Sequence, residues 1–336
     1  MTEPTTTQEL TKKDFVSDQA VRWCPGCGDY AILAQAQKQM PTFGRKREEF
    51  VFVSGIGCSS RFPYYMNTYG FHSIHGRAPA LASGVKIANP DLSVWVVTGD
   101  GDGLSIGGNH FMHALRRNMD LNILMFNNRI YGLTKGQYSP TSEVGKVTKA
   151  TPYGSIDIPL NPPSLALGAQ ATFVARTIDR WQKHMAEMME RSYHHDGGSF
   201  IEIYQNCNIF NDGAFEPYTG SEKMDNVIEL KHGEPMLFAK ETKGIKLDGY
   251  KAVVVDMEKS SIDEVLVHDE TNLDLAHLIA NWTSSPELPE PIGVIYSIDK
   301  PTYNQDMVDQ INFAKEKKGT GSVQDLLNAG DTWIVG

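Results

Sequence analysis

The sequence has few of the features that mark a membrane or nucleic-acid-binding protein. Its formal net charge is -10 and its main basic run is residues 45–47, which argues against nucleic acid or an anionic membrane as the main partner. Its apolar runs, such as residues 123–126, are far shorter than the roughly 20 residues of a membrane helix. Residues 1–15 are polar and have no hydrophobic segment of the kind a secretory signal needs. We therefore expect a cytoplasmic protein that binds neither membranes nor nucleic acid.

Cysteine is also scarce, and the setting expected for the protein gives the few cysteines weight. The chain has four: Cys24, Cys27, Cys58 and Cys207. Structural disulfides are rare in a reducing compartment, so a metal-binding or redox role is favoured. The alternative is a chance Cys-x-x-Cys pair with two ordinary buried thiols. The Pro-Gly pair at residues 25–26 bends the backbone between Cys24 and Cys27, which favours a ligand loop over an ordinary helix entry.

What the chain does contain is a series of short apolar runs that predict strands. Helical patterns separate runs that are rich in β-branched and aromatic residues, at residues 50–53, 94–97, 121–126, 172–178 and 200–205. This alternation predicts an α/β fold with a parallel sheet. Four strands are closely followed by a potential ligand, namely Cys58, Asp100, Asn128 and Cys207. Because the carboxyl ends of parallel strands share one edge, we expect two kinds of site along that edge.

The first of these sites is predicted to bind a hard cation with a diphosphate. Asp100 lies in a Gly-Asp-Gly turn after one strand, and Asn127 and Asn128 end the next strand. The oxygens of Asp100 and Asn128 suit Mg²⁺, which takes oxygen ligands and keeps positions for phosphate and water. The backbone amides of the glycine turn and of the following helix favour a diphosphate beside the metal. A merely tight turn would not need the paired amides.

Other candidate ligands carry weaker signals. His75 lies in a loop, where a lone histidine is usually a surface or packing residue. His110 and His113 are three residues apart on a predicted helix, but no third ligand of suitable spacing follows, so we interpret them as surface or packing residues. The glycine loop at residues 55–57 is not a dinucleotide fingerprint, because Ser60 replaces the third glycine.

Composition divides the chain into three parts. Residues 1–22 are predicted to be a polar arm with little to pack. Residues 23–216 carry all the motifs described above, and Asp29 is expected to cap the first helix of this part. Residues 217–336 have mixed charge, and we expect a C-terminal extension that serves subunit contacts. Within it, residues 286–291 are predicted to be an extended linker.

Taken together, the motifs resemble those of one enzyme family. They are WCPGCG at residues 23–28, GIGC at 55–58, HGR at 75–77, GDG at 99–101 with NN at 127–128, and YGLTKGQ at 131–137. The GDG and NN pair resembles the metal-diphosphate motif of thiamine-diphosphate enzymes. The combination resembles the β subunit of the 2-oxoacid:ferredoxin oxidoreductases, most closely the 2-oxoglutarate branch, over residues 20–215. This resemblance implies the thiamine-diphosphate-binding fold, a mostly parallel sheet with helices on both faces, plus a C-terminal extension.

The resemblance also implies the ligands of the cofactors. One [4Fe-4S] cluster would use every cysteine of the chain: Cys24, Cys27, Cys58 and Cys207. Zinc is the alternative with the same ligands. Mg²⁺ would be bound by Asp100, Asn128 and the carbonyl of Ile130. Thiamine diphosphate would contact the loops around the metal, at Gly57, Ser59, His75, Gly76, Gly99, Asp100, Gly101, Asp102, Asn128, Tyr131, Gly132, Leu133 and Thr134.

The activity implied by the resemblance is the oxidative decarboxylation of a 2-oxoacid. 2-Oxoglutarate, coenzyme A and oxidised ferredoxin would give succinyl-CoA, CO₂ and reduced ferredoxin, in a reversible reaction that depends on thiamine diphosphate. Pyruvate, or a broad range of 2-oxoacids, is the alternative substrate. The alternative classes are a thiamine-dependent decarboxylase without redox chemistry and an iron-sulfur electron-transfer subunit without catalysis.

Two cations are candidates for binding substrate carboxylates. Arg61 and Lys135 lie in two loops of the same predicted sheet edge, and either can pair with a carboxylate. We expect Lys135 to bind the distal carboxylate of 2-oxoglutarate, with Leu133 shaping the pocket. His75, by the resemblance, is expected to contact the cofactor or the substrate.

A component of the reaction is missing from the sequence. Thiamine enzymes take the glutamate that activates the aminopyrimidine from a second domain, and this chain has no second α/β unit of suitable pattern. The resemblance therefore implies an α subunit that supplies the glutamate and most of the coenzyme A site. We expect an αβ pair that dimerises to (αβ)₂, with ferredoxin, the 2-oxoacid and coenzyme A as its other partners.

Overall fold

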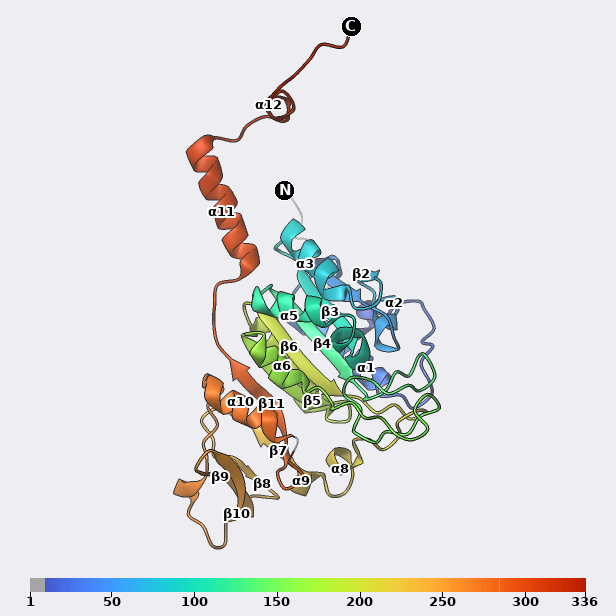
Figure 1. Ribbon diagram of the computed structural model, residues 1–336, viewed down its shortest axis with the longest axis vertical. Coiled ribbons are helices and arrows are strands. Elements are labelled where there is room, and N and C mark those ends of the chain that lie inside the picture. The colour runs from blue at the N-terminus through green and yellow to red at the C-terminus, as the bar shows by residue number, and fades with distance from the viewer. Residues whose placement is uncertain (1–9, 284) are drawn as a thin grey trace, which may run out of the picture.

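An eight-stranded sheet runs through the molecule, with helices on both of its faces (Figure 1). The computed structural model describes residues 10–283 and 285–336. The strands of this sheet are β1 (Phe50–Ser54), β2 (Tyr69–His72), β3 (Ser93–Gly99), β4 (Leu121–Asn127), β5 (Phe173–Ile178), β6 (Gly198–Tyr204), β7 (Val227–Leu230) and β11 (Glu290–Ser297). Their order is β2-β1-β3-β4-β6-β5-β11-β7. All neighbours pair in parallel except β11 and β5, so the predicted mostly parallel sheet is confirmed.

Alternating side chains along the strands build two hydrophobic layers. In β3, Val94 and Val96 belong to one layer, and Trp95 and Val97 belong to the other. The first layer packs against α3 (Ala78–Ala88), α5 (Gly108–Arg116), α6 (Pro162–Gly168) and α10 (Leu273–Trp282). The second layer packs against α1 (Asp29–Gln39), α2 (Phe62–Tyr65) and α7 (Gln182–His194). Helices therefore cover both faces, as predicted.

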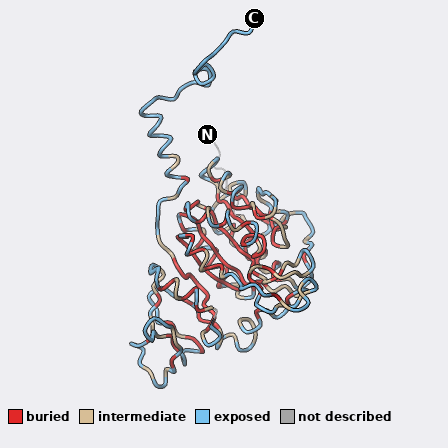
Figure 2. Tube along the Cα trace, in the orientation of Figure 1, coloured by how far each residue is buried: buried red, intermediate tan, exposed pale blue. Residues whose placement is uncertain are grey.

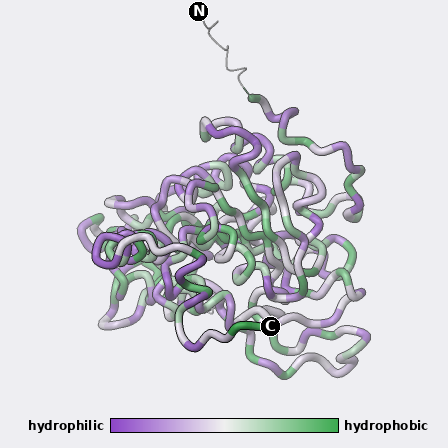
Figure 3. Tube along the Cα trace, turned by 90° about the horizontal axis from the view of Figure 1, so that it is seen from above, coloured by the Kyte–Doolittle hydropathy of each residue, from purple (hydrophilic) through white to green (hydrophobic). Residues whose placement is uncertain are grey.

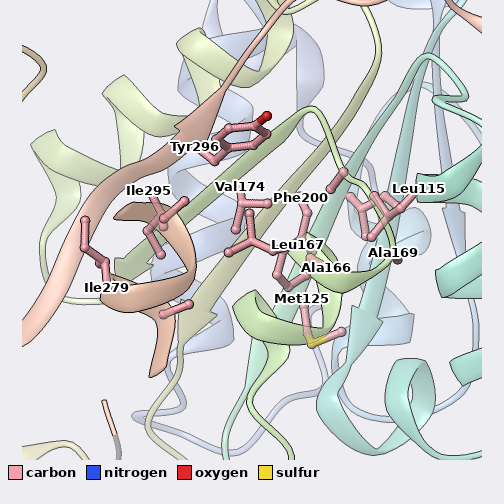
Figure 4. Close-up of a cluster of buried hydrophobic side chains, with 14 of the residues drawn as sticks. Leu115, Met125, Ala166, Leu167, Ala169, Val174, Phe200, Ile279, Ile295 and Tyr296 are labelled. Atoms are coloured by element: carbon pink, nitrogen blue, oxygen red, sulfur yellow. The ribbon is translucent and has the colours of Figure 1, made fainter. Parts of the chain in front are cut away.

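The C-terminal part of the chain belongs to the same core. In Figure 4, Ile279 of α10 and Ile295 of β11 lie in one cluster with Val174 of β5. Figure 2 shows that burial continues along the strands of this part. The boundary predicted at residue 217 therefore does not separate two bodies, because β7 and β11 extend the main sheet. The linker predicted at residues 286–291 is wrong at its end, where the buried Glu290 begins β11.

The described part of the N-terminal segment also packs on the core. Phe15, at the end of the 3-10 helix η1 (Lys12–Phe15), is fully buried, and its ring lies edge-on to that of Phe50 with 5.7 Å between centroids. The backbone of Val16 bridges to that of Met66. The prediction of an arm with little to pack is therefore wrong for residues 10–22. Residues 1–9 of that prediction lie outside the described residues.

The remaining elements lie at the periphery. A small antiparallel sheet contains β8 (Leu237–Phe238), β9 (Lys243–Asp248) and β10 (Lys251–Asp256). Short helices are α4 (Asp100–Leu104), α8 (Glu216–Thr219), α9 (Lys223–Asn226), η2 (Met40–Phe43), η3 (Arg47–Glu49), η4 (Ser59–Arg61) and η5 (Ile262–Glu264). The C-terminal α11 (Tyr303–Lys318) and α12 (Val323–Leu327) project from the body (Figure 1). The chain ends in exposed hydrophobic residues, coloured green in Figure 3. Within the described ranges, no helix has both the length and the apolar character required to cross a bilayer.

A buried histidine makes the stability of this fold depend on pH. Nδ1 of His184 in α7 lies 2.8 Å from Oγ1 of Thr177, and Nε2 has no hydrogen-bond partner among the described residues. Burial lowers the pKa of His184 from 6.5 to about 4. As the pH falls, the unfolded chain gains this proton near pH 6.5 but the folded chain only near pH 4. The contribution to stability is therefore complete above pH 6.5 and falls by roughly 3 kcal/mol by pH 4.

We expect His184→Asn, which keeps a polar atom near Oγ1 of Thr177, to remove this part of the pH dependence. Urea unfolding at pH 7 and pH 4.5 measures it. The control is His194→Asn, at an exposed position of the same helix, which should retain the wild-type difference between the two pH values. An unchanged pH dependence in His184→Asn would contradict the assignment.

Candidate active site

The loops after neighbouring strands β1, β3 and β4 form a cavity of about 750 Å³ at the carboxyl edge of the sheet. Nearly all of the residues predicted to contact the cofactor or its metal line this cavity: Gly57, Ser59, His75, Gly99, Asp100, Gly101, Asp102, Asn128, Ile130, Tyr131, Gly132, Leu133 and Thr134. Gly76 is absent from this lining within the described chain, although its backbone N–H donates to Asp102. The fold thus brings together residues that are up to 77 positions apart, from Gly57 to Thr134, as the sheet-edge argument predicted.

Strand β3 delivers Asp100 to the floor of this cavity. The Asp100 side chain is buried, and its Oδ2 accepts hydrogen bonds from Oγ of Ser139 at 2.5 Å and from Oγ1 of Thr141 at 2.6 Å. Burial raises the pKa of Asp100, and these two hydroxyls act in the opposite direction. A buried carboxylate that faces a cavity and is held by neutral donors suits a cation. Sequence reasoning missed Ser139 and Thr141, which lie in a loop without regular structure.

The two asparagines at the end of β4 have different partners. Asn128 accepts a hydrogen bond at Oδ1 from the N–H of Ile130 at 3.1 Å and donates from Nδ2 to Oε1 of Gln205 at 2.9 Å. These partners fix which end of the Asn128 amide carries the oxygen. Asn127 instead is buried in the protein, where Nδ2 donates to Oε1 of Glu202 at 2.7 Å. Only Asn128 of this pair lines the cavity, among the residues the structure describes.

Asp102 ties three loops together beneath the cavity. Its Oδ1 accepts from the N–H groups of Ile56 at 3.1 Å and Gly76 at 2.7 Å, and its Oδ2 accepts from Oγ1 of Thr98 at 2.7 Å. Oδ1 also lies 2.6 Å from Nδ1 of His75. Protein donors thus occupy the Asp102 carboxylate. It fixes the ring of His75, which lines the cavity.

The four cysteines line a second cavity, of about 220 Å³. A Cβ atom placed on Gly132 would lie 3.5 Å from Sγ of Cys58 and 3.6 Å from Sγ of Cys207, so the absence of a side chain there brings the backbone close to both thiols. Burial raises the pKa of Cys58 to about 12 and also raises that of Cys27. These thiolates would therefore form together with metal binding. In residues 10–283 and 285–336, no group of three or more His, Cys, Asp or Glu side chains is suited to hold a single metal ion.

The two candidate cations for the substrate lie apart from the larger cavity. Lys135 lines the cysteine cavity. Arg61 lines the cysteine cavity and also a third cavity of about 490 Å³, together with Arg22. This third cavity shares Ile56, Gly57 and Leu133 with the 750 Å³ cavity. Leu133 lines all three cavities, and its role in shaping the substrate pocket stays a prediction.

Asp29, which was expected only to cap a helix, also lines the 750 Å³ cavity. Gly28, not Asp29, is the N-cap residue of α1, and Asp29 makes no side-chain capping bond, so the predicted cap is wrong. Both Asp29 carboxyl oxygens are buried, and neither forms a well-oriented hydrogen bond with the residues that the structure describes. Burial raises the pKa of Asp29 to about 7. No sequence motif distinguishes this buried carboxyl from an ordinary residue in the first turn of a helix.

Fold and cavity together define a thiamine-diphosphate enzyme. A family model described as "Thiamine pyrophosphate enzyme, C-terminal TPP binding domain" matches residues 55–203, which begin directly after β1 and carry β2 to β5 and nearly all of β6. These residues include Asp100, Asn128 and His75.

Individual relatives narrow this class. The chain is 52% identical to the 2-oxoglutarate oxidoreductase subunit KorB of Mycobacterium tuberculosis, over 99% of this chain and 90% of the relative. It is 46% identical to subunit beta of 2-oxoacid:ferredoxin oxidoreductase 1 of Aeropyrum pernix, over 62% and 64% of the two chains. A solved structure of 2-oxoglutarate:ferredoxin oxidoreductase from Magnetococcus marinus, with 2-oxoglutarate, coenzyme A and succinyl-CoA bound, superimposes with a TM-score of 0.78 at 32% identity, covering 97% of this chain and 98% of that chain. The chain belongs to the β subunits of the 2-oxoacid:ferredoxin oxidoreductases and is most similar to the 2-oxoglutarate branch, which confirms the resemblance seen in the motifs.

Proposed function

We propose that this chain is the β subunit of an enzyme that converts 2-oxoglutarate, coenzyme A and oxidised ferredoxin to succinyl-CoA, CO₂ and reduced ferredoxin, reversibly. The observation that carries this proposal is the contact between the two cavities. Cys58, Asn128, Gly132 and Gln205 line both the 750 Å³ cavity and the cysteine cavity. A decarboxylase without redox chemistry would have no use for four cysteines beside its cofactor. The names of the relatives support 2-oxoglutarate as the substrate.

The larger cavity fits thiamine diphosphate held by Mg²⁺. Asp100 and Asn128 would bind the metal, with the carbonyl of Ile130 as a further ligand. The fit rests on the buried Asp100 carboxylate and on the fixed orientation of the Asn128 amide. When bound, thiamine diphosphate supplies the electron sink for decarboxylation. The chain positions the diphosphate, and Asp102 holds the His75 ring at the cavity wall.

The smaller cavity fits a [4Fe-4S] cluster better than zinc. A structural zinc ion is held by four ligands that converge on one point, and it would have no role beside the proposed diphosphate site. The thiols of Cys24, Cys27, Cys58 and Cys207 instead surround a space of about 220 Å³. The cluster would carry single electrons away from the thiamine site.

A relative of this chain is named as a β subunit, which implies that an α subunit accompanies it. We propose that the α subunit supplies the glutamate for the aminopyrimidine and most of the coenzyme A site, and that ferredoxin accepts the electrons. An (αβ)₂ assembly and a cytoplasmic location stay predictions.

Anaerobic preparation of this chain tests the proposed function. We expect four irons per chain, an electron paramagnetic resonance signal on reduction, bound thiamine diphosphate, and no decarboxylation by the chain alone. Addition of the α subunit and ferredoxin should give turnover of 2-oxoglutarate. Stoichiometric zinc in place of iron would refute the redox function, and robust turnover by the chain alone would refute the need for a partner. Cys58→Ser is the control for cluster-dependent signals.

Substrate selection is a separate question, which two substitutions address. The prediction that Lys135 binds the distal carboxylate is compared with a role for Arg61, which lines a cavity that adjoins the thiamine cavity. Loss of one charged hydrogen bond should lower the preference for 2-oxoglutarate over pyruvate by roughly 10-fold to 100-fold. The ratio of kcat/KM values for the two substrates measures this in Lys135→Ala and Arg61→Ala. A change in Arg61→Ala alone would contradict the Lys135 assignment, and Arg61→Lys is the charge-conserving control.

A further inference from the structure

Gln205 touches both proposed cofactor sites with one side chain. It follows β6 and is buried, with 1% of its surface exposed, and it lines both the thiamine cavity and the cysteine cavity. Its Oε1 accepts a hydrogen bond from Nδ2 of Asn128 at 2.9 Å. Its Nε2 donates to the carbonyl of Asn206 at 2.5 Å and lies 3.3 Å from Sγ of Cys27, within hydrogen-bond distance for sulfur. One amide therefore joins a proposed magnesium ligand to a proposed cluster ligand.

The surrounding groups determine which way this amide points. A carbonyl accepts but cannot donate, so the side of Gln205 that faces the Asn206 carbonyl must be the NH₂ group. On the other side, the N–H of Ile130 requires Oδ1 of Asn128, which leaves Nδ2 of Asn128 to face Gln205. Reversing the Gln205 amide would place its NH₂ group against the donor Nδ2 of Asn128, and its oxygen against the carbonyl oxygen of Asn206. The N–H of Ile130 thus fixes the Asn128 amide, and Asn128 fixes the Gln205 amide with its NH₂ group toward Cys27.

The cysteine loop packs directly on the stem of this side chain. A Cβ atom on Gly28 would lie 2.0 Å from Oδ2 of Asp179 and 3.0 Å from Cγ of Gln205, so a side chain at this position would keep the loop away from both residues. The backbone N–H of Gln205 also donates to the carbonyl of Asn127 at 3.0 Å, which fastens it to the end of β4. Gln205 is thus held at its backbone, its stem and both ends of its amide.

Each end of the amide has a chemical consequence. At the Asn128 end, the bond keeps Oδ1 available to a metal, because outer partners fix the orientation of the groups that bind metals. At the Cys27 end, an N–H group directed at a thiolate stabilises negative charge on the sulfur. Hydrogen bonds to the sulfurs are among the factors that set the reduction potential of an iron-sulfur cluster, and such a bond favours the reduced, more negative state.

We propose that Gln205 is a positioning residue shared by the two cofactors: it orients Asn128 toward Mg²⁺ and, through its hydrogen bond to Cys27, raises the reduction potential of the cluster. This inference rests on the proposed function. It goes beyond that function because it assigns to one side chain both the orientation of a magnesium ligand and an effect on the reduction potential of the cluster. Gln205 belongs to no sequence motif that indicates this role. It directly precedes Asn206 and Cys207, and the sequence pattern predicts only the end of a strand there.

Two substitutions separate the two ends of the amide in the anaerobically purified αβ holoenzyme. Gln205→Glu keeps an acceptor for Asn128 but replaces the donor to Cys27 with a negative oxygen. Gln205→Met has similar length and removes both hydrogen bonds. The reduction potential of the cluster is measured by a redox titration followed by electron paramagnetic resonance. The affinity for thiamine diphosphate is measured by titration in the presence of Mg²⁺.

We expect both variants to have a more negative potential, with the cluster reduced roughly tenfold less readily, about 59 mV for one electron. Only Gln205→Met should also lose affinity for thiamine diphosphate, by roughly 10-fold, as for loss of an outer partner. Gln37→Met is the matched control, because Gln37 is also a buried glutamine, donating to the Tyr65 carbonyl at 3.0 Å, but lines neither cavity. It should leave both quantities at the wild-type value.

The outcomes divide clearly. A wild-type potential in Gln205→Glu overturns the proposed bond to the cluster, and this variant keeps the test decisive if Gln205→Met does not fold. Wild-type affinity for thiamine diphosphate in a folded Gln205→Met overturns the role at Asn128. Equal shifts in the Gln37→Met control would show a merely structural effect and refute the proposal. Absence of iron from the wild-type holoenzyme would instead refute the proposed function, which keeps the two failures distinct.

Discussion

Replacing Asp100 by alanine is expected to abolish Mg²⁺-dependent binding of thiamine diphosphate, and turnover with it. Asp100 is the buried carboxylate at the floor of the 750 Å³ cavity, and Asn128 alone supplies no charge to hold the cation. The loss should exceed the roughly 100-fold that removal of an outer partner costs in metal affinity or activity. Calorimetric titration of thiamine diphosphate with and without Mg²⁺ measures the binding, and 2-oxoglutarate-dependent reduction of ferredoxin by the αβ complex measures turnover.

A matched variant separates loss of the ligand from loss of local structure. Ser139→Ala removes one of the two hydroxyl groups that donate to Asp100 and leaves Thr141 in place. It should weaken binding by roughly 10-fold, as for an outer partner of a metal ligand. Equal effects of Asp100→Ala and Ser139→Ala, or unchanged Mg²⁺ dependence in Asp100→Ala, would contradict the assignment of Asp100 as the metal ligand.

Replacing Arg176 by methionine is expected to lower the free energy of unfolding by about 3–5 kcal/mol. Arg176 of β5 is fully enclosed between two carboxylates, with Nε 2.6 Å from Oε2 of Glu202 and Nη1 2.5 Å from Oε1 of Glu290. Substitution removes the cation and leaves two buried carboxylates without their charge partner. Urea unfolding at pH 7 measures the loss, with the slope of the transition as a check that the same structure unfolds.

Two further variants test the cause. Arg191→Met breaks the pair with Glu270 at the surface, where the Arg191 side chain is 36% exposed, and should cost about 1 kcal/mol or less. Adding Glu202→Gln and Glu290→Gln to Arg176→Met should recover part of the lost stability, because both buried charges are then removed. Similar losses for Arg176→Met and Arg191→Met would contradict the burial argument.

The parts of the site that could be predicted from sequence are those fixed by local pattern. Apolar runs predict the strands, and the turn after each strand places Asp100, Asn128 and Cys58 at one edge. The residues that support these ligands could not be predicted in this way. Ser139 lies in a loop 39 positions after Asp100, beyond α5 and β4, and no periodicity predicts a hydroxyl that meets a carboxylate only in the folded state.

The same reason explains the errors at the two ends of the chain. Glu290-Pro291 has the composition of a linker, but Glu290 is drawn into the sheet by an arginine 114 positions earlier. Phe15 is a single aromatic residue in a polar segment, and its contact with Phe50 and the bridge from Val16 to Met66 exist only in the folded chain. Long-range pairing decides both cases, and a window of neighbouring residues contains no information about it.

The enclosed Arg176 connects the last strand of the sheet with the region of Asp100. Hydrogen bonds lead from Glu290 through Arg176 to Glu202 and from there to Asn127, and the one hydroxyl of Thr141 lies within hydrogen-bond distance of both Asn127 and Asp100. Glu290, the carboxylate at the far end of this series, lies 190 positions after Asp100 in the sequence. A chain that ended before β11 would leave Arg176 without one of its two carboxylate partners, so the series that leads toward Asp100 is complete only when β11 is present.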